Sequence, residues 1–234
     1  REGFYWEKLF KENIVIGTEI EVMFKNERIN TSAVERMIRD GCGEGSNPGD
    51  LRCPVEEVKS DGSLSSGAEI LTPGRRFHSF LQMFSQYKMI YDSIASEEPI
   101  IDQRMGWHNH ILLSNYNRVA VAEMPVPNII LKNLLSLCKY YYPALAFISS
   151  TTPDKGVHTR YNSFCVDSNL KKYDPTEEMK RTLEKFNNRY NAINLNPISI
   201  EGTNRDGDLK DFHIEFRFPD GNVSPVLMTS LNVL

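Results

Sequence analysis

Alternation of apolar and chemically active side chains near the end of the chain constrains the fold most strongly. Residues 212–218 read Phe-His-Ile-Glu-Phe-Arg-Phe. Because side chains alternate across an extended strand, one face would carry the apolar residues and the other His213, Glu215 and Arg217. The segment therefore predicts a strand with one side on a core and the other on a functional site.

Two upstream segments show the same alternation. Glu19 and Glu21 lie two residues apart, as do His108 and His110. Taken singly, each pattern is more typical of a solvated strand face, a packed histidine pair or a cross-strand ion pair. Together they predict three strands whose acids and imidazoles share one face, an arrangement that could surround divalent metal ions.

The remaining periodicity predicts the fold class. Alternating or β-rich runs predict strands at 14–24, 55–59, 68–71, 105–113, 189–195 and 211–218. Helical spacing predicts helices at about 31–39, 75–96, 128–142 and 174–187, the third ending or kinking at Pro143 and the fourth capped by Asp174. Strands grouped as hairpins with helices between them predict an α+β fold with a mostly antiparallel sheet of about six strands. We expect a single domain over 1–234.

Composition excludes several classes of partner. The chain has 27 basic and 31 acidic residues, so it carries no positive field to attract nucleic acid. Its longest apolar stretch, 126–149, is interrupted by Lys132, Lys139 and Pro143, which predicts a buried helix and no membrane partner. Four irregularly spaced cysteines predict free thiols, and with no leader peptide visible they favour a cytoplasmic location. The chain begins at Arg1, which a tag, a processed end or a fragment would explain.

The acidic residues predict a site for hard cations. Glu19 and Glu21 on one face repel each other unless a cation lies beside them, and Asp61 and Glu69 add two acids flanking a turn. Mg²⁺ and Mn²⁺ prefer oxygen ligands and usually keep substrate phosphates as further ligands. Three arginines offer planar, bidentate contacts to phosphate: Arg160, Arg189 and Arg217. Metal ions with arginines predict phosphoryl transfer.

Six short motifs occur in a characteristic order. They are Gly17-Thr18-Glu19-Ile20-Glu21, Asp61-Gly62-Ser63, Gly67-Ala68-Glu69-Ile70, Gly106-Trp107-His108-Asn109-His110, the run 189–195, and Ile214-Glu215-Phe216-Arg217. This series resembles the amidoligases, a family of the carboxylate–amine ligase superfamily that includes glutamine synthetase and glutamate–cysteine ligase. The resemblance spans about residues 14–219. It implies a glutamine synthetase-like catalytic domain, whose curved antiparallel sheet holds ATP and two or three divalent ions.

The resemblance also implies a role for each matched residue. The metal nearer the acceptor substrate would be held by Glu21, Asp61 and Glu69. The metal on the ATP phosphates would be held by Glu19, Glu215 and one histidine of the His108–His110 pair, of which we favour His108. Catalytic arginines would be Arg217, on the transferred phosphate, with Arg160 and Arg189, on phosphate or carboxylate. The nucleotide site would comprise Arg160, Arg217, His110 and Asn194, with Asn194 in an outer layer.

The implied activity is ATP-dependent ligation. ATP with Mg²⁺ or Mn²⁺ would phosphorylate the carboxylate of a small molecule or peptide, and an amine donor would attack the acyl phosphate to form an amide or peptide-like bond. One alternative is a metal-dependent phosphohydrolase or amidohydrolase that uses the His108–His110 pair and needs further histidine ligands. The other is a catalytically silent nucleotide-binding module of the same fold. The oligomeric state stays open.

Overall fold

The structure is a computed structural model with seven strands and six α-helices among its described residues. It describes residues 14–42, 53–62, 64, 67–76, 79–100, 105–113, 127–149, 165–195, 198, 209, 212–221 and 224–233. The strands are β1 (Ile14–Phe24), β2 (Glu57–Lys59), β3 (Gly67–Leu71), β4 (Pro99–Ile100), β5 (Trp107–Leu113), β6 (Ile193–Asn194) and β7 (Phe212–Phe216). The helices are α2 (Thr31–Gly41), α3 (Phe80–Ile94), α4 (Asn128–Ile148), α5 (Ser168–Lys171), α6 (Met179–Phe186) and α7 (Pro225–Val233), with a short 3₁₀ turn, η1 (Ala95–Glu97), after α3.

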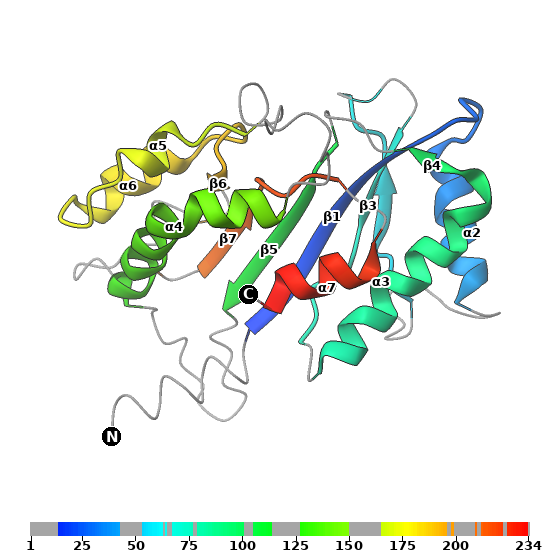
Figure 1. Cartoon of the computed structure of the whole chain (residues 1–234), viewed down its shortest axis with the longest axis horizontal. Helices are drawn as coiled ribbons and strands as arrows, with labels where there is room; N and C mark the ends of the chain where they lie inside the picture. Colours follow the sequence, from blue (N-terminus) through cyan, green and yellow to red (C-terminus); the bar gives the residue numbers. More distant parts are fainter. Residues whose placement is uncertain are drawn as a thin grey trace. The chain divides into compact units, whose positions relative to one another are not determined.

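These elements form an α+β fold around one open, mostly antiparallel sheet (Figure 1). The strand order is β2-β3-β1-β5-β7-β6, and β4 pairs with β1. The predicted fold class is therefore confirmed, with one strand more than expected. Among the described residues, no helix combines the length and the apolar character needed to cross a membrane.

Residue contacts divide the chain into two compact units. One, the 17–109 unit, also contains the C-terminal residues 219–234. The other, the 110–218 unit, also contains the first residues of β1. Because the chain passes between the units more than once, they are not two consecutive domains. The expectation of a single domain stays a prediction.

In the 17–109 unit, the register of three antiparallel strands positions the acidic residues. β1 pairs with β3 from Glu19 opposite Leu71 to Met23 opposite Gly67, and β2 pairs with β3 as the predicted hairpin. Helix α2 begins as predicted, with the Asn30 side chain accepting a hydrogen bond from the Ala33 backbone N–H at 2.9 Å. Helix α7 lies beside α3 (Figure 1), a contact that the tertiary packing confirms.

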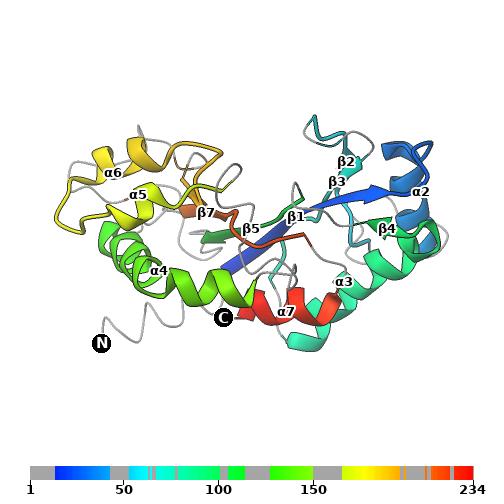
Figure 2. The same ribbon diagram turned by 45° about the horizontal axis from the view of Figure 1, so that its top comes forward.

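In the 110–218 unit, α4 packs against α5 (Figure 2). Buried apolar side chains from helices and strands of this unit form one core. The lysines of α4 bind backbone carbonyls of the segment that follows α5: Lys132 donates to Glu177 at 2.8 Å and Lys139 to Tyr173 at 2.7 Å. The two lysines that interrupt the apolar run thus keep their charges at the edge of the core. The core residues include Leu131, Leu135, Leu183, Phe186, Phe212 and Ile214.

Two helix boundaries differ from the sequence predictions. Helix α3 begins at Phe80, capped by Ser79, rather than at Arg75. The Arg75 guanidinium instead donates to the Cys53 carbonyl, so Arg75 binds the segment that contains Cys53. Helix α4 does not end at Pro143 but continues to Ile148. A proline removes one backbone donor, and the buried packing of this helix outweighs that loss.

The predicted start of the last internal helix is wrong as well. The Asp174 carboxylate accepts hydrogen bonds from the Thr176 backbone N–H at 2.8 Å and from its hydroxyl at 2.7 Å. It therefore closes a local turn, and α6 starts only at Met179. The strand expected at 189–195 shrinks to β6, because Arg189 lies in a turn. The short elements β4, α5 and α7 were not predicted.

Candidate metal centre

Three carboxylates meet in the 17–109 unit. Glu21 and Glu69 are direct partners across β1 and β3, a position where like charges repel. Asp61, in the turn after β2, adds a third acid, and one oxygen from each of the three lies within 4.8 Å of the others. Lys59, opposite Glu69 on β2, approaches its carboxylate to 3.3 Å. A group of three acids with this one lysine favours a hard divalent cation, which prefers carboxylate ligands.

Burial makes the repulsion within this group costly. The Glu21 side chain is 6% exposed and the Glu69 side chain 17%. Burial raises the pKa of Glu69 above its ordinary value, the Glu19 carboxylate raises it further, and Lys59 only partly offsets this. Burial by itself lowers the pKa of Lys59, but the nearby carboxylates, Glu69 first, raise it overall. A bound cation would stabilise the charged form of Glu69.

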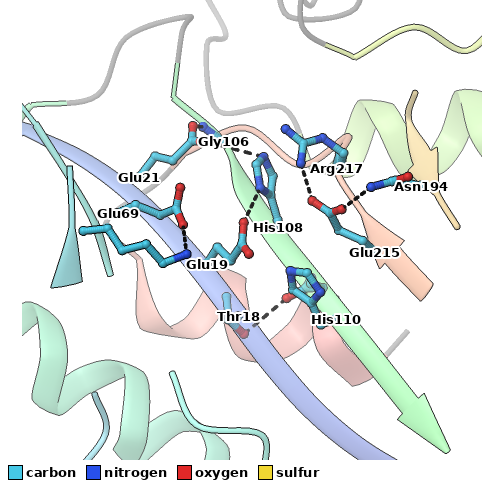
Figure 3. Close-up of polar contacts among 12 residues, drawn as sticks. Thr18, Glu19, Glu21, Glu69, Gly106, His108, His110, Asn194, Glu215 and Arg217 are labelled. Carbon is cyan, nitrogen blue, oxygen red and sulfur yellow. Dashed lines mark hydrogen bonds and ion pairs between the residues drawn. The ribbon is translucent and has the colours of Figure 1, made fainter. Parts of the chain in front are cut away.

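His108 connects two of the predicted metal ligands. Its Nδ1 lies 3.0 Å from a Glu19 oxygen and its Nε2 lies 3.5 Å from a Glu21 oxygen (Figure 3). The second oxygen of Glu21 accepts a hydrogen bond from the Gly106 backbone N–H. A neutral imidazole carries one N–H and can donate to only one carboxylate. A cation between the ring and the other carboxylate would satisfy both, so the donor set fits a metal ion.

In the 110–218 unit, two neighbours hold Glu215. Asn194 is opposite Glu215 in the β6–β7 register and donates its amide N–H to one carboxylate oxygen at 2.7 Å. Arg217 forms an ion pair with the other oxygen (Figure 3). Among the described residues, no hydrogen-bond acceptor reaches the buried Nε of Arg217. An anionic group such as phosphate would satisfy this donor.

A second histidine contact lies in the same unit. His110 Nδ1 and His213 Nε2 are 2.8 Å apart, so one ring donates to the other. Sequence reasoning placed His213 on the functional face but gave it no role. It also missed Lys59 and the backbone N–H of Gly106. The hairpin register would have placed Lys59 opposite Glu69, whereas no sequence signal marks the backbone donor.

The roles given to all of the predicted site residues stay predictions. Arg189 lies on an exposed turn, where it donates to the Tyr190 hydroxyl at 2.8 Å and lies 5.0 Å from the centre of that ring. Arg160 lies outside the described residues. Glu215 belongs to a different unit from Glu19 and His108, so the grouping of these three around one metal stays a prediction.

No protein-family model matches this chain, and no curated protein matches its sequence. Among solved structures, it is similar to the cryo-EM structure of Plasmodium falciparum glutamine synthetase, with 12% sequence identity and a TM-score of 0.45. The match covers 98% of this chain and 52% of that chain. The chain thus spans about half the length of the solved structure that it matches.

Proposed function

We propose that this protein is an ATP-dependent carbon–nitrogen ligase of the amidoligase type. ATP phosphorylates a substrate carboxylate, and an amine then attacks the acyl phosphate with loss of phosphate. The observation that carries the proposal is the three-acid group of Glu21, Asp61 and Glu69, which brings one oxygen of each half-buried or buried carboxylate within 4.8 Å of the others. The order of the six sequence motifs supports it independently.

Each residue has a distinct part in this reaction. Glu21, Asp61 and Glu69 hold one divalent ion, Glu19 and His108 are ligands of a second, and Glu215 is a further metal ligand. Bound Mg²⁺ or Mn²⁺ supplies neutralisation of phosphate charge. Arg217 donates to the transferred phosphate, because its guanidinium is always charged and its buried Nε has hydrogen-bonding capacity left. Asn194 holds Glu215 in place, and His110, Arg160 and Arg189 bind nucleotide or carboxylate.

The test is ADP release with a panel of carboxylates and amines. Small-molecule and peptide carboxylates are each combined with ammonia or a primary amine, Mg²⁺ and ATP. We expect ADP formation that requires both a carboxylate and an amine, and a loss of about 100-fold or more in the Glu21→Gln variant. Glu57→Gln is the matched control, because Glu57 is an exposed acid on β2 outside the three-acid group. ADP release that is indifferent to every carboxylate and amine pair would contradict the proposal.

The two alternatives give different results in the same experiment. A phosphohydrolase built on the His108–His110 pair would hydrolyse a phosphoester in the absence of nucleotide. A catalytically silent module would bind ATP with Mg²⁺ in calorimetry but release no ADP with any pair of substrates.

A further inference from the structure

A line of hydrogen-bonded polar side chains runs from the C-terminal helix to the two strands that carry Glu19 and His108. Asn232 on α7 donates its amide N–H to the Tyr87 hydroxyl on α3 at 2.6 Å. The Tyr87 oxygen lies 2.7 Å from Thr18 Oγ1 on β1, which lies 3.5 Å from Asn109 Oδ1 on β5. All four residues belong to the 17–109 unit. They connect two helices to the strands of the candidate metal centre.

The direction of every hydrogen bond in this line follows from the chemistry of the groups. An amide nitrogen can only donate, so the Tyr87 oxygen accepts from Asn232 and uses its single hydrogen toward Thr18. Thr18 Oγ1 then accepts from Tyr87 and donates to the amide oxygen of Asn109. Burial raises the pKa of Tyr87, which keeps the hydroxyl protonated. Loss of any one group removes a hydrogen bond from each of its neighbours on this line.

The line ends beside two of the candidate ligands. Thr18 directly precedes Glu19, and Asn109 directly follows His108. Because consecutive side chains of a strand point to opposite faces, these two polar groups lie behind the ligand face. Thr18 is further held by Thr72, whose hydroxyl accepts from the Thr18 backbone N–H at 2.9 Å.

The aromatic ring of Tyr87 adds an apolar contact at the same place. It packs edge-on against Trp107, with ring centroids 6.1 Å apart, and Trp107 directly precedes His108. Thr18, Tyr87 and Trp107 are each 2% exposed or less. Both strand positions next to the Glu19–His108 contact are therefore held through this one tyrosine on α3.

We propose that Tyr87 is a positioning residue, which acts through Thr18 and Asn109 to hold Glu19 and His108 in contact, and that Asn232 ties helix α7 to this arrangement. The inference rests on the proposed function in taking that contact as part of a cation site. Tyr87 itself touches neither cation nor substrate. Its hydroxyl sets the strand positions from which the two ligands project.

The test compares Mn²⁺ affinity in variants that remove or keep single hydroxyl groups. Tyr87→Phe and Thr18→Val delete a hydroxyl at nearly constant volume, while Thr18→Ser keeps it. Tyr91→Phe is the matched control, because the Tyr91 hydroxyl donates to Met228 Sδ at 3.0 Å across the same two helices. We expect calorimetry on folded protein to show a loss of about 10-fold or more in Mn²⁺ affinity for Tyr87→Phe and Thr18→Val. The serine variant recovers most of it, and Tyr91→Phe stays within about twofold.

A second measurement needs no metal. The ¹⁵N chemical shifts of the His108 ring report its contact with Glu19, and we expect them to move in Tyr87→Phe but not in Tyr91→Phe. Asn232→Leu replaces Tyr87→Phe if that variant does not fold. Unchanged affinity and unchanged ring shifts in Tyr87→Phe, or equal losses in Tyr91→Phe, would overturn the positioning role. If wild-type protein binds no Mn²⁺, the proposed function fails, while the ring shifts still decide the positioning role.

Discussion

Replacement of Glu69 by glutamine separates two effects of the three-acid group. One is the repulsion among its carboxylates, and the other is the binding of a divalent ion. Without a divalent ion, Glu69 lies among carboxylates that repel it, and we expect Glu69→Gln to be more stable than the wild type. With a divalent ion the wild type gains a ligand that the variant lacks. The same substitution should therefore stabilise the metal-free protein and weaken its response to Mg²⁺.

The magnitude follows from the distances. Each carboxylate pair within 4.8 Å repels by about 1 kcal/mol at the dielectric constant of water and about 3.5 kcal/mol at an effective value of 20. Glu69 has two such neighbours, and Lys59, 3.3 Å away and 43% exposed, partly offsets their effect. The net gain expected for Glu69→Gln is about 0.5 to 2 kcal/mol. For a chain of this length that corresponds to a rise of about 1 to 8 °C in Tm.

The difference in stability between Glu69→Gln and the wild type also depends on pH and on the divalent ion. Because the pKa of Glu69 is raised in the folded state, its contribution to stability is present below the unfolded pKa and is lost as pH rises through the folded pKa. The advantage of the glutamine variant should therefore grow from acid to neutral pH. Mg²⁺ at 100 times its Kd should stabilise the wild type by about 2.7 kcal/mol and the variant by much less.

Thermal unfolding at low ionic strength, with chelator and then with Mg²⁺, measures both effects. Glu57→Gln again serves as the control, since it removes one exposed acid from the same strand group without touching the three-acid group. A Glu69→Gln variant that melts below the wild type in chelator would refute the reasoning. So would an equal rise in Tm with Mg²⁺ in both proteins.

Three further substitutions test the fold. Gly67→Ala places a Cβ 2.8 Å from the Val22 carbonyl oxygen and should lower the free energy of unfolding, measured with denaturant, by about 1 to 3 kcal/mol. A Cβ at Gly62 meets nothing within 4 Å, so Gly62→Ala should change it little. Asn30→Ala removes the cap of α2 and should cost about 1 kcal/mol, most of which Asn30→Ser should restore. Burial raises the pKa of Cys138 to about 12, so the stability of the fold should fall as pH rises from about 8.5 toward that value. Cys138→Ala should flatten this decline. An unchanged dependence of stability on alkaline pH in the variant would contradict the prediction.

Local patterns predicted much of the fold and the composition of the candidate site. Alternation predicted β1 with its observed bounds, and helical spacing after Asn30 and Thr31, either of which could cap a helix, predicted the start of α2. The same alternation placed Glu19 and Glu21 on one face, and both now contact His108. Such predictions succeed because the period of a strand and the geometry of a cap depend on neighbouring residues alone.

Tertiary structure decided what depends on groups distant in the chain. Asp174 has the sequence of a helix cap, but its carboxylate binds Thr176 in a separate turn. Tyr87 follows a helical apolar pattern that gives no sign of a hydroxyl shared with Thr18 and Asn232. The amino-acid sequence by itself determined which faces carry acids and which carry apolar groups, since that is set by backbone periodicity. Only the folded chain determined which polar groups meet, because a hydrogen bond between residues 145 positions apart depends on how the elements pack.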